Sequence, residues 1–82
     1  MTCIRDLRTE IDEVDRRMLA LLEKRFSLTK KIGEIKRKQQ KPIYDSEREK
    51  QVLGRLSTNT DLDSCFVEKI FKQIIAFCRE NE

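Results

Sequence analysis

The chain has 82 residues, 40% of them charged, yet its formal net charge is only +3, which argues against a dedicated nucleic-acid-binding protein and leaves room for a local anion site. It has no histidine, and its three cysteines, Cys3, Cys65 and Cys78, share no spacing typical of a metal site or a disulfide framework, so we expect a reducing, cytoplasmic location. No apolar run approaches the length of a membrane span, and a domain this small buries too little surface to be comfortably stable as a monomer.

The first predicted helix is much longer than the segments that follow it. It runs from about Ile4 to about Lys38 with no breaker except Gly33, and Pro42 ends the segment. A helix of this length measures roughly 50 Å, whereas a compact chain of this size has a diameter of about 30 Å. Its apolar positions alternate in steps of three and four, as in a heptad repeat; this heptad stripe comprises Ile4, Leu7, Ile11, Val14, Met18, Leu21, Leu28, Ile32 and Ile35. We therefore expect the uncovered stripe to pack against a second copy in a twofold homodimer.

Two shorter helices are predicted after the long one. The second opens at "DSERE", where Ser46 and Glu49 match a capping box. The polar segment "STNTDLD" leads to the third helix, for which Asp63 or Ser64 would be the N-cap. The apolar face of this third helix is broad and comprises Phe66, Val67, Ile70, Phe71, Ile74, Ile75 and Cys78. Because glycine and proline are rare and no alternating strand pattern occurs, the predicted fold is all-α, with three helices in a single domain over residues 1–82.

One position of the heptad stripe is charged. Arg25 stands between Leu21 and Leu28, where a guanidinium has no reason to face a dry seam unless a polar partner meets it. Lys36 follows eleven residues later, so both side chains share one helix face, about 16 Å apart along the axis. A small dianion would fit between these two cations. The alternative is that Arg25 only fixes the register of the helical dimer.

Other charged residues are candidates for the same site. Arg8 lies about 25 Å before Arg25 along the helix, too far to join it within one chain, but Arg8 of a crossing partner helix would reach it. Asp45 and Glu49 are one turn apart at the start of the second helix, where they would cap the helix and compensate its dipole; Glu49 would alternatively accept a hydroxyl or hold a cation. Glu82 either continues the apolar stripe of the third helix or is a terminal residue without a role.

Four segments, in order along the chain, resemble the all-helical, AroQ-type chorismate mutases. They are "LRTEIDEVDRRMLALLEKR", "IGEIK", "PIYDSERE" and "VEKIFKQIIAFCR", which together span essentially the whole chain. The resemblance implies an intertwined homodimer with two active sites, an isomerase that rearranges chorismate, a small dicarboxylate, to prephenate on the route to phenylalanine and tyrosine. It also implies that no cofactor takes part. A pericyclic rearrangement needs no nucleophile or metal, which agrees with a chain that lacks histidine.

The same resemblance implies a role for individual residues. Arg8 resembles the arginine that the partner chain contributes, and Arg25 the arginine that binds a substrate carboxylate. Lys36 resembles the lysine that binds a carboxylate and the ether oxygen. Glu82 stands where the best-known members have glutamine beside the ether oxygen, and a carboxyl group donates a hydrogen bond there only while protonated. The other implied substrate-binding positions are Asp45, Arg48 and Glu49 near the substrate hydroxyl, Cys78 where a serine is common, and the apolar walls Ile32, Val52 and Ile75.

Three other functions stay open on the sequence alone. A helical isochorismate pyruvate-lyase would share the fold and the basic site, although the acidic "DSERE" segment favours the mutase. A non-catalytic dimerisation module would use Arg25 only as a register device. Weak nucleic-acid binding through "KKIGEIKRKQQK" would lack the interleaved aromatic residues that such sites use.

Overall fold

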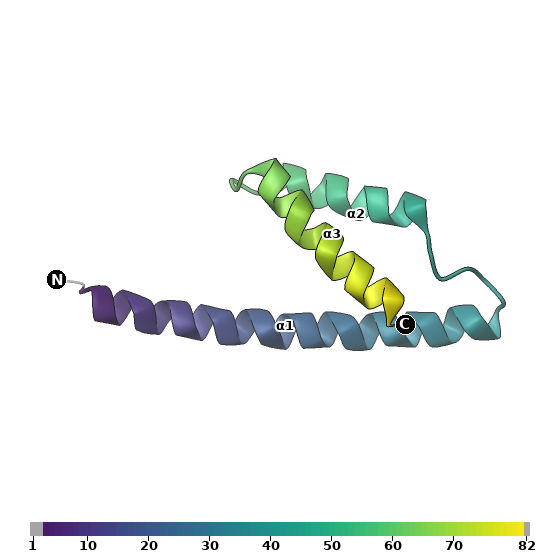
Figure 1. Ribbon diagram of the computed structural model, residues 1–82, viewed down its shortest axis with the longest axis horizontal. Coiled ribbons are helices and arrows are strands. Elements are labelled where there is room, and N and C mark those ends of the chain that lie inside the picture. The colour runs from purple at the N-terminus through teal and green to yellow at the C-terminus, as the bar shows by residue number, and fades with distance from the viewer. Residues whose placement is uncertain (1–2, 82) are drawn as a thin grey trace.

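The computed structural model describes residues 3–81, which form three α-helices and two connections (Figure 1). α1 (Ile4–Lys38) has 35 residues, α2 (Ser46–Thr58) has 13 and α3 (Ser64–Glu80) has 17. The all-α prediction is confirmed, and the predicted bounds of the long helix are those observed. Among the described residues, no helix combines the length and the apolar character needed to cross a membrane.

The molecule is elongated because α1 extends far beyond the other two helices. Its principal extents are 58 × 24 × 16 Å and its radius of gyration is 16.2 Å, against about 12 Å for a compact chain of this length. α2 and α3 form a helical hairpin over the later part of α1, and the N-terminal part of α1 projects away from that hairpin (Figure 1). The expectation that the long helix exceeds the globule of its own chain is confirmed.

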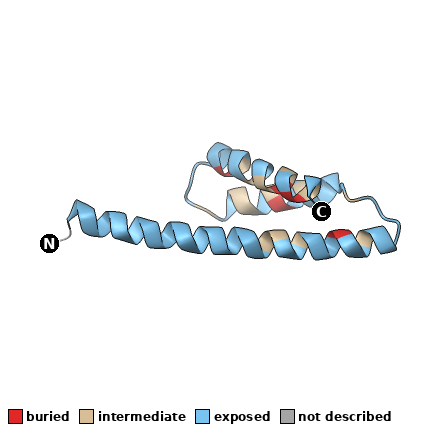
Figure 2. Ribbon diagram, turned by 60° about the horizontal axis from the view of Figure 1, so that its bottom comes forward, coloured by how far each residue is buried: buried red, intermediate tan, exposed pale blue. Residues whose placement is uncertain are grey.

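α3 joins the other two helices. It packs along α2 and, near its C-terminal end, on α1, whereas α1 and α2 do not pack directly within the described residues. The ring of Phe77 on α3 lies 5.4 Å from that of Phe26 on α1, centroid to centroid. Within residues 3–81, the buried apolar side chains belong to α2 and α3 (Figure 2); they are Val52, Val67, Ile75 and Cys78. The small core therefore lies between α2 and α3, and α3 sets the distance between α1 and α2.

The heptad stripe of α1 is exposed along its whole length. Its nine apolar side chains keep between 47% and 69% of their surface accessible, and Figure 2 shows nearly all of α1 as exposed. A contiguous exposed apolar surface of this extent marks an interaction site. The stripe is thus available for the second copy that the sequence predicts, and the homodimer itself stays a prediction.

The helix N-caps differ from the prediction in one place. Asp45, and not Ser46, is the N-cap of α2, because its carboxylate accepts a hydrogen bond from the backbone amide of Arg48 at 3.1 Å. The prediction of Ser46 as the N-cap in a capping box is therefore wrong, because the N-cap lies one residue earlier. Asp63 is the N-cap of α3 and accepts from the amide of Phe66 at 3.2 Å, which confirms one of the two predicted caps.

The C-terminal end of α1 is a Schellman turn that closes before Pro42. Gln40 has a left-handed φ of 56°. Its amide donates to the carbonyl of Arg37 at 3.2 Å, and the amide of Lys41 donates to the carbonyl of Lys36 at 2.8 Å. These two bonds satisfy carbonyls that would otherwise lack partners, so the helix ends by its own turn and Pro42 only follows it.

Candidate active site

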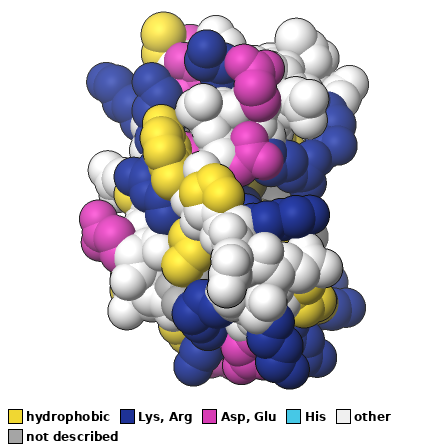
Figure 3. Space-filling view, turned by 90° about the vertical axis from the view of Figure 1, so that its right-hand side faces the viewer, with side chains coloured by type: hydrophobic (Ala, Val, Ile, Leu, Met, Phe, Trp, Pro, Cys, Tyr) yellow, Lys and Arg dark blue, Asp and Glu magenta, His cyan; other side chains and the backbone are white. Residues whose placement is uncertain are grey.

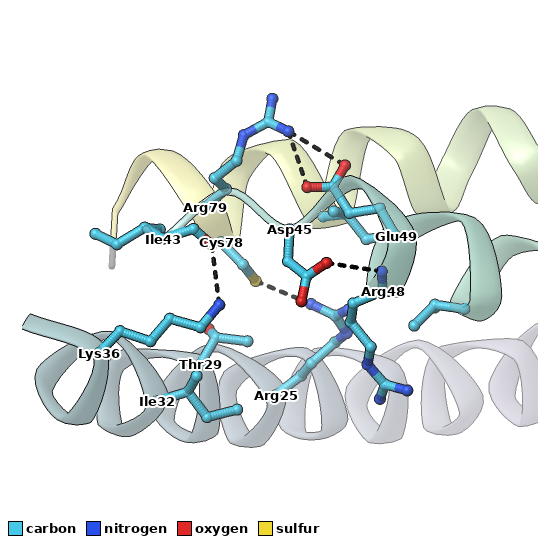
Figure 4. Close-up of a pocket in the computed structure, with 12 residues that line it drawn as sticks. Arg25, Thr29, Ile32, Lys36, Ile43, Asp45, Arg48, Glu49, Cys78 and Arg79 are labelled. Carbon is cyan, nitrogen blue, oxygen red and sulfur yellow. Dashed lines mark hydrogen bonds and ion pairs between the residues drawn. The ribbon is translucent and has the colours of Figure 1, made fainter. Parts of the chain in front are cut away.

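A pocket lies between the later half of α1, the start of α2 and the end of α3 (Figure 4). Its volume is about 160 Å³. It exists because α3 holds α1 and α2 apart, so that side chains of both helices point into the space between them. Nine of the eleven predicted site residues line it: Arg25, Ile32, Lys36, Asp45, Arg48, Glu49, Val52, Ile75 and Cys78.

Two predicted site residues are not part of this pocket as the structure describes it. Arg8 is exposed near the start of α1, and its 17-residue separation from Arg25 corresponds to about 25 Å along the helix. Arg8 therefore does not reach the pocket of its own chain. Glu82 lies outside the described residues, so its predicted role stays a prediction.

Arg25 contacts α3 within the chain. Its Nη1 donates a hydrogen bond to Sγ of Cys78 at 3.2 Å (Figure 4). Cys78 is buried, with 4% of its surface exposed, and Arg25 is half-buried. A thiol sulfur is a weak acceptor, and a guanidinium has five N–H donors. Arg25 is thus held at the pocket by a contact that leaves it able to bind a stronger acceptor such as a carboxylate.

Lys36 is held by the connection that follows α1. Its Nζ donates to the backbone carbonyl of Ile43 at 3.0 Å, a contact that becomes possible because the Schellman turn directs the chain back over the helix. An ammonium has three donors, so this bond orients the side chain without using its full capacity. Arg25 and Lys36 therefore line one pocket, as their spacing on the helix predicts.

The two carboxylates of the pocket have partners of their own. Asp45 caps α2, and Figure 4 shows its side chain directed toward α1. Glu49 is turned toward α3 (Figure 4), where both of its oxygens accept from Nη1 of Arg79, at 2.9 and 3.2 Å. Capping, one of the two roles expected for Asp45, is confirmed. The cation that Glu49 contacts comes from its own chain.

Three lining residues are absent from the sequence-based prediction: Thr29, Ile43 and Arg79. Thr29 follows Arg25 by one helical turn, so its place between Arg25 and Lys36 could have been found from periodicity. Ile43 could not, because it contributes a backbone carbonyl from an irregular segment. Arg79 adjoins Cys78 in the sequence, but only the relative placement of α2 and α3 brings it to Glu49.

The electrostatic character of the pocket suits an anion. Among its lining residues within 3–81, four are cations and two are carboxylates, which gives these residues a formal charge of +2 (Arg25, Lys36, Arg48 and Arg79 against Asp45 and Glu49). The space-filling view in Figure 3, seen along the molecule from the C-terminal end of α1, shows Lys and Arg side chains at several places on that face. Within residues 3–81, no group of three or more His, Cys, Asp or Glu side chains is placed to hold a metal ion.

Comparisons with known proteins agree on one family. The model of the family "chorismate mutase type II" matches residues 7–82. A bifunctional chorismate mutase/prephenate dehydratase of Aquifex aeolicus is 37% identical over 81 residues, which cover 92% of this chain and 22% of the relative. A T-protein of Haemophilus influenzae is 42% identical over 81 residues, with 99% and 22% covered. A chorismate mutase of Methanocaldococcus jannaschii is 38% identical over 73 residues, with 85% and 74% covered.

Solved structures agree with the sequence comparisons. Two forms of a chorismate mutase from Thermus thermophilus superpose on this chain with TM-scores of 0.88 and 0.91, both at 32% identity. They cover 92% and 94% of this chain, and this chain covers 96% and 90% of theirs. By contrast, the chain spans about a fifth of the length of the Aquifex and Haemophilus relatives.

Proposed function

Because the chain belongs to the chorismate mutase type II family, we propose that it rearranges chorismate to prephenate, in the biosynthesis of phenylalanine and tyrosine. The observation that carries this proposal is that Arg25 and Lys36, both on α1, line one pocket whose described lining has a net positive charge. Chorismate is a dicarboxylate, and two separated cations are what its two carboxylates require. The proposal concerns only the reaction catalysed by this chain and not the second activity of its longer, bifunctional relatives.

The reaction is intramolecular, so the protein contributes by positioning and by electrostatics. One carbon–carbon bond forms as the carbon–oxygen bond of the ether breaks, and no group is transferred to or from the protein. Arg25 binds one carboxylate and Lys36 binds the other carboxylate and the ether oxygen, which holds the reacting carbons close together. Negative charge grows on the ether oxygen, and Lys36 stabilises that charge more strongly in the transition state than in the ground state.

The remaining lining residues orient the substrate ring. Asp45 and Glu49 lie on the α2 side of the pocket, where they accept the substrate hydroxyl, and Arg48 adds positive charge on the same side. Apolar contact with the ring comes from α1, α2 and α3, through Ile32, Val52 and Ile75. These contacts exclude water, which strengthens the polar contacts made by Arg25 and Lys36.

We also propose that the working unit is an intertwined homodimer in which Arg8 of each chain completes the pocket of the other. The exposed heptad stripe supports this arrangement, since a second α1 would cover it and would bring a second Arg8 close to Arg25. A twofold dimer of this kind has two equivalent sites. The three free cysteines, all in the described part of the chain, support the proposal of a reducing, cytoplasmic location.

A product assay tests the proposed function directly. The purified chain is incubated with chorismate and, separately, with isochorismate, and the products are identified by NMR. Prephenate from chorismate supports the mutase, whereas pyruvate from isochorismate would assign the lyase. A bicyclic dicarboxylate that mimics the transition state should raise the melting temperature of the chain. If neither product forms and the mimic does not raise the melting temperature, the result would support the non-catalytic dimerisation module.

A further inference from the structure

We propose that Arg79 is a positioning residue: it binds the carboxylate of Glu49 and keeps that negative charge away from the cations that receive the substrate. Arg79 adjoins a predicted site residue and was not itself predicted to belong to the pocket. The kinetic test of this role, which measures KM for chorismate, rests on the proposed mutase function. The effect of Arg79 on binding of a dianion can be measured without catalysis.

The contact between Arg79 and Glu49 joins two elements at the pocket. Nη1 of Arg79, in the last turn of α3, lies 2.9 Å from Oε2 and 3.2 Å from Oε1 of Glu49, in the first turn of α2. The two side chains are 34% and 25% exposed. By comparison, the ion pairs of Glu13 with Arg16 and Arg17 lie within one turn of α1 and are 51% to 76% exposed. Partial burial makes the pair between α2 and α3 less screened by solvent than those local pairs.

Tyr44 supports Arg79 from a second direction. The guanidinium carbon of Arg79 lies 4.6 Å from the centroid of the Tyr44 ring, within the range of a cation–π interaction. Tyr44 belongs to the connection between α1 and α2, so Arg79 contacts this connection as well as α2. Contacts with both a ring and a carboxylate restrict where the guanidinium lies.

The pair also forms part of the wall between two hollows. Glu49, Ile75 and Arg79 line the pocket already described and also a second hollow on the other side of the pair, next to Tyr44 and Lys72. Truncating Arg79 would therefore open the pocket toward the second hollow and admit more water. Water would weaken every electrostatic contact that the substrate makes there.

The distribution of partners shows why the pair matters. Arg25 and Lys36 donate to uncharged acceptors, a thiol sulfur and a backbone carbonyl. Asp45 accepts from a backbone amide, and Glu49 accepts from Arg79. Within the described part of the chain, these contacts leave Arg25 and Lys36 without a carboxylate partner. A Glu49 released from Arg79 would either bind one of these cations or repel the substrate dianion.

The expected effect is on binding more than on the chemical step. Arg79→Ala removes one positive charge from the pocket and releases one negative charge into it, which weakens ground-state and transition-state binding of a dianion alike. We expect KM to rise by about tenfold and kcat to change by less than about threefold. Arg79→Lys, which keeps the charge but not the planar stacking group, should lie between the wild type and Arg79→Ala.

The decisive experiment is a double-mutant cycle with Glu49→Gln, which removes the negative charge but keeps the shape of the side chain and a carbonyl oxygen that can still accept the substrate hydroxyl. KM for chorismate and the Kd of the bicyclic dicarboxylate, by calorimetry, are measured for the wild type, each single variant and the pair. If Arg79 acts through Glu49, Glu49→Gln should recover most of the loss in the Arg79→Ala background. Arg55→Ala, which removes an equal charge from an exposed position on α2 outside both hollows, is the control and should leave KM and Kd unchanged.

Other outcomes have separate meanings. Strictly additive losses, or an equal loss in Arg55→Ala, would overturn the proposal, and so would a fall in kcat at unchanged KM, because Arg79 would then act on the transition state itself. If Arg79→Ala fails to fold by circular dichroism, the Arg79→Lys and Arg79→Lys/Glu49→Gln pair provides the same test. If the wild type makes no prephenate, the proposed function fails, while the calorimetric cycle still decides whether Arg79 controls dianion binding.

Discussion

The two halves of α1 carry the same heptad pattern in different surroundings. Every described residue from 3 to 24 is exposed, whereas the later half has one buried and several half-buried residues; these are Arg25, Phe26, Thr29, Gly33 and Lys36. Two of these five are the cations predicted to bind substrate. The chain thus uses its own α3 and the segment after α1 to build a pocket, and leaves most of the heptad stripe exposed.

Of the five covered residues of α1, only Arg25 is a position of the heptad stripe. Phe26 and Gly33 lie beside stripe positions, and neighbouring residues of a helix point about 100° apart. Meanwhile Leu28 and Ile35, which belong to the stripe, keep 49% and 54% of their surface exposed. α3 and a second copy would therefore contact mainly different faces of α1. The two faces meet at Arg25 and Ile32, which are stripe positions that also line the pocket.

The largest effect is expected from a charge placed in the uncovered half. Val14→Lys puts an ammonium on the stripe, and a charge without a partner in a dimer seam costs about 3–5 kcal/mol for each chain. We expect sedimentation to show dissociated or unfolded chains, with prephenate formation reduced more than about 100-fold. Thr9→Lys adds the same charge on the opposite face and should have little effect. A Val14→Lys chain that stays monomeric, folded and fully active would remove the argument for a dimer.

The next largest effect concerns Arg25, where the two halves meet. Arg25→Ala should reduce kcat/KM by about 3–4 kcal/mol, comparable to or more than the loss of one oxyanion donor. The fold should persist, because the hydrogen bond from Arg25 to α3 ends on a weak sulfur acceptor. Lys24→Ala, which removes the neighbouring exposed cation, is the matched control. Near-normal activity of Arg25→Ala together with a changed oligomeric state would identify Arg25 as a register device.

A mixing experiment connects the two halves of the helix. Arg8→Ala and Arg25→Ala chains should each be nearly inactive alone. When they are refolded together, half of the dimers are mixed and each mixed dimer has one intact site, so activity should return to about one quarter of the wild type. A mixture that is no more active than its parents would mean that Arg8 and Arg25 do not act in a site shared between chains.

Much of this fold follows from the sequence, because helix length and apolar spacing are local properties. The bounds of α1, the exposed stripe and the shared pocket of Arg25 and Lys36 were all predictable from periodicity. What was not predictable depends on how α3 crosses the other helices. The contacts of Cys78 with Arg25 and of Arg79 with Glu49 join segments that are 53 and 30 residues apart, and no local pattern fixes that geometry.

The smallest effect is expected at the turn that ends α1. Gln40 has a left-handed φ, which a glycine adopts without the steric penalty of a side chain. Gln40→Gly should therefore stabilise the chain by up to about 1 kcal/mol, seen as a higher midpoint in urea unfolding. Gln39→Gly, one residue earlier at a φ of −89°, is the control and should not stabilise. If Gln40→Gly stabilises the chain and Gln39→Gly does not, the gain comes from the left-handed backbone at residue 40. If Gln40→Gly gives no gain, the side chain at this position carries no steric penalty.

The uninterrupted length of α1 has a mechanical consequence for the proposed dimer. In that dimer, Arg8 and Arg25 of one chain would serve different pockets, about 25 Å apart along one helix. Over that distance, a bend of about 2° displaces the far end by about 1 Å, an error large enough to reduce a rate by about 100-fold. The bending stiffness of the helix, which has no proline and no glycine before Gly33, would then be as much a determinant of turnover as the side chains that touch the substrate.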